Sequence, residues 1–132
     1  MEIQPRIALI DDDAFWLDTM SEFLAGRGFD IQTASSGLSG LALLKERTIP
    51  LAMVDFHMPD MDGLQLLRSL REEHHPAAVL LVSGDGDPSL PTRAREEGAL
   101  GFFSKTTPPR VLLRALDQAW EQISEGTNTQ DN

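Results

Sequence analysis

Short runs of apolar residues alternate along this chain with segments in which apolar residues recur at helical spacing. The short runs have the length and continuity of strands that are buried on both faces of a parallel sheet. They are Ile7–Ile10, Leu51–Val54, Ala77–Val82 and Leu100–Phe103. A weaker, alternating run at Phe29–Ala34 is typical of an outer strand. The pattern therefore predicts five strands.

The segments between these runs predict five helices. Four of them have an apolar face, marked in turn by Leu17, Met20 and Leu24; by Leu38, Leu41 and Leu44; by Leu64, Leu67 and Leu70; and by Val111, Leu112, Ala115, Leu116 and Ala119. A short polar helix is expected near Leu90–Glu97, because Pro91 is favoured in a first helical turn. Gly28 and Gly98 each follow an expected helix, where glycine accommodates a left-handed C-terminal cap.

Strands that alternate with helices across short connections predict a doubly wound α/β sheet with right-handed crossovers. The length of 132 residues fits one domain, which we expect to span residues 1–123. The segment 124–132 has almost no apolar content. It is therefore expected to be a disordered tail or the start of an interdomain linker.

Composition excludes several classes of function. The chain has 11 Lys+Arg against 21 Asp+Glu and a formal net charge of −10, which argues against nucleic-acid binding by this domain. It has no cysteine, so disulfides, thiolate metal sites and cysteine nucleophiles are excluded. No apolar run approaches the roughly 18 residues that a membrane span needs. We therefore expect a cytoplasmic protein without a membrane partner.

Charged and hydroxyl residues follow the apolar runs directly. Asp11 and Asp12 follow the first run, Asp55 ends the third, Ser83 ends the fourth and Lys105 follows the fifth. Ligands of open α/β sheets bind beyond the carboxyl ends of the strands, so these side chains are expected to converge. Carboxylates roughly 5 Å apart repel by about 3 kcal/mol at an effective dielectric near 20, and a cation offsets this repulsion.

A few oxygen ligands with room for water favour Mg²⁺, with Mn²⁺ as an alternative, over zinc. Beside such a cation, Asp55 can act as a nucleophile toward phosphorus. Lys105 can then pair with one phosphoryl oxygen, and the hydroxyl of Ser83 can donate to another. The residues thus predict a phosphoryl-accepting site.

The motifs IDDD, VDFHMPDMDG, VSG and FFSK resemble, in order and spacing, the receiver domain of two-component response regulators. The resemblance covers Arg6 to Ile123 and implies a flavodoxin-like, three-layer (βα)5 fold with strand order 2-1-3-4-5. The segment GALGFFSKTTPPRVLLRAL is most similar to receivers joined to LuxR-type helix-turn-helix domains. That likeness implies control of transcription through a separate output domain.

The resemblance also implies roles for individual residues. Asp55 would accept a phosphoryl group from a sensor histidine kinase or a phosphotransfer protein. Asp12 would bind Mg²⁺ directly and Asp11 largely through water, with the backbone carbonyl of His57 as a further ligand. Apart from its own phosphorylation and dephosphorylation, such a domain catalyses no reaction and is not an enzyme. His57 and Asp85 occupy the positions that tune dephosphorylation.

The resemblance further implies a switch. Ser83 matches the switch hydroxyl, Lys105 matches the family's lysine, and Phe102 matches the aromatic residue that changes rotamer on activation. The surface of the fourth helix, fifth strand and fifth helix would change with them. On that surface a homodimer could form, for which the candidate salt-bridge residues are Arg93, Arg95, Arg110 and Arg114.

Other polar residues are expected to be structural. Asp13 is interpreted as an N-cap, and Asp60 and Asp62 as loop and cap residues, while Pro59 and Gly63 shape the same loop. The remaining candidates are His74 and His75, interpreted as residues of a solvated loop, and Trp16 and Trp120, interpreted as packing groups.

Two departures from the family's common pattern concern loops. Thr106 follows Lys105, where the family often has a proline with a cis bond, so we expect this peptide bond to be trans or strained. After Ser83, the segment GDGDPSLP predicts a mobile loop and a short fourth helix.

Two alternative functions stay open at this point. A phosphatase with an aspartate nucleophile, similar to the haloacid dehalogenase group, would carry a D-x-D pair, whereas Phe56 and His57 follow Asp55. A degenerate receiver would bind partners without phosphorylation, and the intact set of acids, hydroxyl and lysine argues against it.

Overall fold

The computed structural model describes residues 5–130, and side chains up to residue 124. The elements alternate as the hydrophobic pattern predicts. In chain order they are β1 (Arg6–Ile10), α1 (Ala14–Ala25), β2 (Asp30–Ala34), α2 (Gly37–Glu46), β3 (Leu51–Asp55), α3 (Gly63–Glu72), β4 (Ala78–Ser83), α4 (Leu90–Glu96), β5 (Gly101–Ser104) and α5 (Pro109–Gln130).

The five strands form one parallel sheet in the order β2-β1-β3-β4-β5, which confirms the predicted topology. The continuous apolar strands lie in the middle: β1 pairs with β3 from Ile7↔Leu51 to Ile10↔Val54, and β3 pairs with β4. All five residues of β3 are buried, as expected for a strand covered on both faces. β2 and β5 form the two edges.

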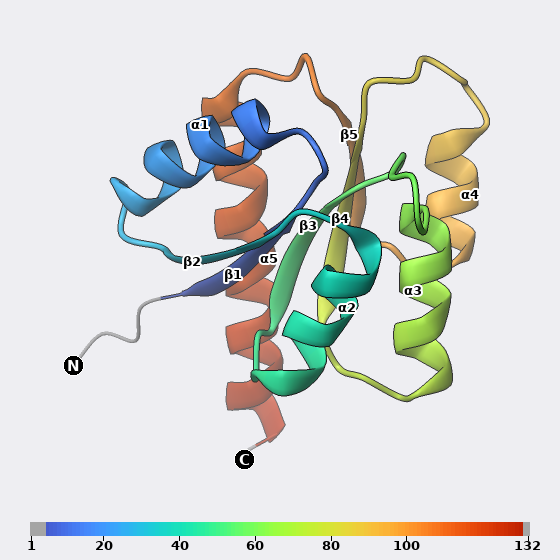
Figure 1. Ribbon diagram of the computed structural model, residues 1–132. Helices are drawn as coiled ribbons and strands as arrows, with labels where there is room; N and C mark the ends of the chain where they lie inside the picture. The colour runs from blue at the N-terminus through green and yellow to red at the C-terminus, as the bar shows by residue number, and fades with distance from the viewer. Residues whose placement is uncertain (1–4, 131–132) are drawn as a thin grey trace.

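Helices cover both faces of the sheet, so the molecule has three layers (Figure 1). One apolar core lies between the sheet and α2, α3 and α4, and it includes Leu44, Leu67 and Ala94. The other core lies between the sheet and α1 and α5, and it includes Leu24 and Leu116. This arrangement confirms the flavodoxin-like fold class.

Local sequence signals explain where helices begin and end. Asp13 caps α1 by accepting hydrogen bonds from the backbone N–H groups of Phe15 and Trp16, as predicted. Gly28 and Gly98 have φ values of 96° and 95°, in the left-handed region that glycine adopts without strain. No peptide bond within residues 5–130 is cis, so the bond between Lys105 and Thr106 is trans.

The end of the chain differs from the expectation. α5 continues to Gln130, so residues 124–130 are helical where the sequence predicts disorder. Extending a helix that packing has already nucleated fixes one residue for each new hydrogen bond, which requires little apolar content. Residues 131–132 of the predicted tail lie outside the described residues.

Two predicted core positions also differ. Leu38 is 60% exposed and Val111 is 36% exposed, although both were expected on apolar helix faces. Each lies in the first turn of its helix, where its side chain remains accessible to solvent. The neighbouring residues Leu41 and Leu112 are buried as predicted.

α2 approaches β1 closely at Gly40. A Cβ atom added at Gly40 would lie 2.5 Å from Ile10 Cγ2 and 2.7 Å from Ile10 Cδ1. We therefore expect Gly40→Ala to lower the free energy of unfolding by about 1–3 kcal/mol, because overpacking displaces a buried side chain. Urea unfolding measures the change. Gly84→Ala is the control, because no atom lies within 4 Å of an added Cβ there; equal stability of the two variants would contradict the prediction.

Candidate functional site

The carboxyl ends of the strands meet at one edge of the sheet, at the top of Figure 1. Parallel pairing in register brings these ends together, since Asp55 at the end of β3 pairs with Val82 of β4, and Ser83 pairs with Ser104 of β5. The next residue after β1 is Asp11, and the next after β5 is Lys105. The topology thus places the predicted site residues along one rim.

Three carboxylates gather at this rim. One ligand oxygen from each of Asp11, Asp12 and Asp55 can be chosen so that all three lie within 4.8 Å of one another. Asp11 is fully buried and Asp55 is 5% exposed, whereas Asp12 is exposed. The cluster therefore has two carboxylates fixed in the protein and one that faces solvent.

Lys105, the residue after β5, contacts this cluster. Its Nζ lies 2.8 Å from Asp11 Oδ2 and 3.7 Å from Asp55 Oδ2. The indole ring of Trp16, on α1, lies beneath the same ammonium at 5.5 Å from Nζ to the ring centroid. The ring and the two carboxylates hold one positive charge beside the two buried acids.

Electrostatics at the cluster favour an added cation. Burial and the neighbouring Asp11 carboxylate raise the pKa of Asp55 to about 7, although Lys105 and a backbone hydrogen bond from His57 act in the opposite direction. Burial alone lowers the pKa of Lys105, but its ion-pair contact with Asp11 and the attraction of Asp55 raise the pKa overall. One lysine therefore does not fully offset the charge of two buried carboxylates.

The residues present fit a hard divalent cation. Asp11 Oδ2 is buried and has no aligned hydrogen-bond donor among the described residues, so its contact with Lys105 is an ion pair. A buried carboxylate oxygen without a hydrogen-bond donor, beside two further carboxylates, matches the all-oxygen ligand set of Mg²⁺ or Mn²⁺. The other oxygen of the same carboxylate, Asp11 Oδ1, accepts a hydrogen bond from the backbone N–H of Asp13.

Ser83, His57 and Asp85 lie in the loops beside the cluster. The Ser83 side chain is buried, and its Oγ accepts a hydrogen bond from the backbone N–H of Asp85 at 2.9 Å. The Asp85 carboxylate in turn lies 3.0 Å from His57 Nε2, and both side chains are about half exposed. The two predicted tuning residues are therefore in direct contact with each other.

Phe102 is half-buried in β5 beside α4. Residues of α4, including Pro91, Ala94 and Arg95, line with Phe102 an open hollow of about 310 Å³. Arg93, Arg95, Arg110 and Arg114 are all exposed, as a contact surface requires. Arg93 also lies over the Phe56 ring at 5.9 Å from the centroid.

The acids interpreted as structural have that role. Asp62 and Gln65 form a reciprocal capping box at the start of α3. Asp60 accepts hydrogen bonds from the backbone N–H groups of Gly37 and Leu38, so it caps α2 from a distant loop. These bonds lower the pKa of Asp60. Neither residue belongs to the carboxylate cluster.

The two histidines differ from each other. His74 is exposed with φ of 54°. His75, in contrast, bridges two elements, since its Nε2 lies 2.9 Å from the Leu44 carbonyl oxygen and its Nδ1 accepts from the N–H of Ala77. The interpretation as a solvated loop is therefore wrong for His75, because the turn folds the imidazole back onto the end of α2.

Sequence reasoning missed the role of Trp16 beneath Lys105 and the long-range cap of Asp60. Trp16 offered one signal, because it lies in the first turn of the helix that follows the acidic motif. Asp60 offered none, because its partners lie 22 and 23 residues away along the chain.

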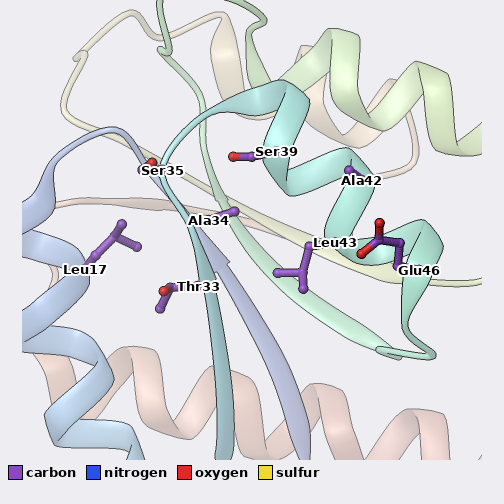
Figure 2. Close-up of a pocket in the computed structure, with 8 residues that line it drawn as sticks. All are labelled: Leu17, Thr33, Ala34, Ser35, Ser39, Ala42, Leu43 and Glu46. Carbon is purple, nitrogen blue, oxygen red and sulfur yellow. The ribbon is translucent and has the colours of Figure 1, made fainter.

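A separate hollow of about 460 Å³ lies between α1, β2 and α2 (Figure 2). Leu17 and Leu43 line it from the two sides of β2, with Ser35, Ser39 and Glu46 at its polar part. None of the clustered carboxylates lines this hollow.

Between residues 5 and 130, no helix combines the length and apolar composition needed to cross a bilayer.

Comparisons with known proteins agree with this geometry. The family model "Response regulator receiver domain" matches residues 7–117. The transcriptional regulatory protein GlrR of Escherichia coli is 29% identical over 123 residues, which cover 93% of this chain and 28% of GlrR. The transcriptional regulatory protein FixJ of Bradyrhizobium diazoefficiens is 26% identical over 130 residues, which cover 98% of this chain and 63% of FixJ.

The fold has a solved counterpart in a CheY-like receiver domain protein from Methanospirillum hungatei. That structure superimposes with a TM-score of 0.88 at 25% identity, over 94% of this chain and 99% of the other. This chain spans less than two thirds of the length of GlrR and FixJ. Because the family model covers most of the chain, the protein belongs to the response regulator receiver domain family.

Proposed function

We propose that Asp55 accepts a phosphoryl group from a sensor histidine kinase or a phosphotransfer protein. The observation that carries this proposal is the position of Asp55, a nearly buried carboxylate flanked by Asp11, Asp12 and Lys105. Phosphorylation on aspartate is typical of receiver domains, and Asp55 is the acid that ends the central strand β3.

In the proposed reaction an Asp55 carboxylate oxygen attacks phosphorus and forms an acyl phosphate, while the donor's bond to phosphorus breaks. Mg²⁺ held by Asp11, Asp12, Asp55 and the His57 carbonyl would neutralise charge on the transferred group when bound. Lys105 stands 3.7 Å from Asp55 Oδ2, close enough to pair with a phosphoryl oxygen. Asp55 attacks in its ionised form, which the same positive charges favour.

We further propose how phosphorylation changes the conformation of the domain and how the phosphoryl group is removed. Ser83 turns its hydroxyl toward the phosphoryl group, and Phe102 moves into the space that it leaves. His57 and Asp85, which contact each other beside the cluster, tune the rate at which water removes the phosphoryl group. In this proposal, the domain catalyses its own phosphorylation and dephosphorylation and no other reaction.

The output surface is proposed to be α4, β5 and α5, with a homodimer as the candidate assembly through Arg93, Arg95, Arg110 and Arg114. GlrR and FixJ are named as transcriptional regulators, and this chain matches part of each. We therefore propose a role in transcription through a separate domain, with the receiver unit at residues 1–123. A cytoplasmic location and the lack of nucleic-acid binding by the receiver itself stay predictions.

Incubation with acetyl phosphate and Mg²⁺, followed by intact-protein mass spectrometry, tests the proposal. We expect the protein to gain one phosphoryl group and Asp55→Asn to gain none, because an amide oxygen is a poor nucleophile. Asp117→Asn, an exposed acid on α5, is the matched control and should be labelled like the native protein. An equal mass gain in Asp55→Asn would assign the acceptor elsewhere, and no gain in the native protein would indicate a degenerate receiver.

A further inference from the structure

The ammonium of Lys105 stands at the end of a flexible side chain. The backbone of this residue is fixed, because its N–H donates a hydrogen bond to the Ser83 carbonyl oxygen at 2.9 Å. The side chain is a flexible four-carbon stem, so the charge takes the position that the surrounding groups favour. The side chain is 21% exposed, so solvent can reach it. The groups that contact Nζ therefore decide how much of the time it lies beside Asp55.

Trp16 is one of these groups. Its ring centroid lies 5.5 Å from Nζ, within the range at which the face of an aromatic ring attracts a cation, and tryptophan attracts cations most strongly. The residue is half-buried and packs against the core between the sheet and α1 and α5, and the next residue, Leu17, is 7% exposed. The ring is therefore anchored on α1, whereas Lys105 lies in the loop between β5 and α5.

Trp16 belongs to a closed series of contacts around the acidic motif. Asp11 Oδ1 accepts a hydrogen bond from the backbone N–H of Asp13 at 2.9 Å. Asp13 Oδ1 in turn accepts from the backbone N–H of Trp16 at 3.2 Å. The Trp16 ring contacts Lys105, whose Nζ lies 2.8 Å from Asp11 Oδ2. The ring is therefore placed relative to the same carboxylate that pairs with the lysine.

The partners of Lys105 are not equivalent in the proposed reaction. Asp11 is its nearest partner, but the Asp11 carboxylate is also a proposed ligand of the divalent cation. Lys105 must then exchange Asp11 for a phosphoryl oxygen on Asp55, whose Oδ2 lies 3.7 Å from Nζ. An aromatic face attracts a cation without a directed hydrogen bond, so this contact can persist as the ammonium moves. Of the described groups that contact Nζ, Trp16 alone takes no part in the exchange.

We propose that Trp16 is a positioning residue for Lys105, and that its indole ring holds the ammonium at the carboxylate cluster while the lysine changes partner from Asp11 to the phosphoryl group. This inference rests on the proposed function. Without the ring, the ammonium spends more of its time in solvent, and fewer encounters with a phosphoryl donor find it beside Asp55. The ring thus accelerates formation of the acyl phosphate without contacting the reacting atoms.

The rate of labelling by acetyl phosphate at saturating Mg²⁺ tests this role in a matched pair of variants. Trp16→Phe keeps an aromatic face, whereas Trp16→Leu keeps an apolar side chain without that face. We expect Trp16→Leu to be labelled about fivefold more slowly than the native protein, the factor that corresponds to about 1 kcal/mol, and Trp16→Phe about twofold more slowly at most. Trp120→Leu, which replaces a half-buried tryptophan in the middle of α5, is the control and should be labelled at the native rate.

A double-mutant cycle in metal-free buffer separates positioning of Lys105 from support of α1. It uses urea unfolding in the Asp55→Asn background, where Lys105→Met leaves Asp11 as the one buried carboxylate of the cluster. Trp16→Leu should raise the equilibrium constant for unfolding about fivefold more when Lys105 is present than in Lys105→Met. Equal effects in the two backgrounds, or equal labelling rates of Trp16→Phe and Trp16→Leu, would overturn the role of Trp16 alone. Absence of labelling in the native protein would instead count against the proposed function, and the cycle would still measure the contact.

Discussion

Replacing Asp55 with asparagine raises the free energy of unfolding by about 2–4 kcal/mol at pH 8 in metal-free buffer, because a shift of about three pKa units corresponds to about 4 kcal/mol at most. Burial and the Asp11 carboxylate raise the pKa of Asp55 from 3.8 to about 7. A raised pKa means that the folded protein holds the proton more tightly than the unfolded chain. The native protein therefore loses stability as the pH rises from 3.8 through about 7. Asparagine has no charge to bury and avoids that loss.

Urea unfolding at pH 4 and at pH 8 measures this difference. We expect the gain to be large at pH 8 and to nearly vanish at pH 4, where Asp55 is protonated in the folded protein. Saturating Mg²⁺ should reduce the gain at pH 8, since a ligand that binds only the folded state stabilises the native protein. Asp117→Asn should change stability by less than about 0.5 kcal/mol, as exposed substitutions do. A less stable Asp55→Asn at pH 8 would contradict the prediction.

Replacing Lys105 with alanine lowers the free energy of unfolding by about 2–3 kcal/mol at pH 8 without metal, somewhat less than the cost of breaking a fully buried ion pair. Its side chain is 21% exposed and contacts Asp11, which is fully buried. Removal of the ammonium takes away the positive charge that contacts both the Asp11 and the Asp55 carboxylates. Loss of the contact with Trp16 adds a smaller cost.

The pair of Lys45 and Glu73 supplies the matched control. Its N–O distance of 2.7 Å is as short as that of Lys105, but its side chains are 41% and 50% exposed. Lys45→Ala should cost less than about 1 kcal/mol, because solvent screens exposed pairs. The double variant Lys105→Ala/Asp55→Asn should recover most of the loss, since one carboxylate of the uncompensated pair is gone. Equal costs for the two lysines would show that burial does not strengthen the Lys105 pair.

Much of the fold and the site is encoded in local sequence. Continuous apolar runs identify the buried strands, and the residue that ends each run must lie at the carboxyl edge of a parallel sheet. That rule alone brings Asp11, Asp55, Ser83 and Lys105 to one rim, where the structure has them. The capping residues Asp13 and Asp62 are predictable for the same reason, because a cap acts within its own first turn.

The features that sequence did not predict depend on partners far along the chain or on marginal energies. Asp60 caps α2 across 22 and 23 residues, and His75 contacts Leu44 across 31 residues. The extension of α5 to Gln130 depends on a small balance between helix propagation and fraying. The 60% exposure of Leu38 depends on how α2 sits against the sheet, which helical periodicity alone does not determine.

The segment from Asp55 to Asp62 performs several tasks in few residues. It begins with the proposed phosphoacceptor, presents His57 to Asp85, caps α2 through Asp60 and caps α3 through Asp62. Adding or deleting a single residue here would shift at least one of these groups out of register with its partner. The positions of these partners therefore fix the length of this loop, so an insertion here would disturb the proposed phosphoacceptor and the starts of two helices together.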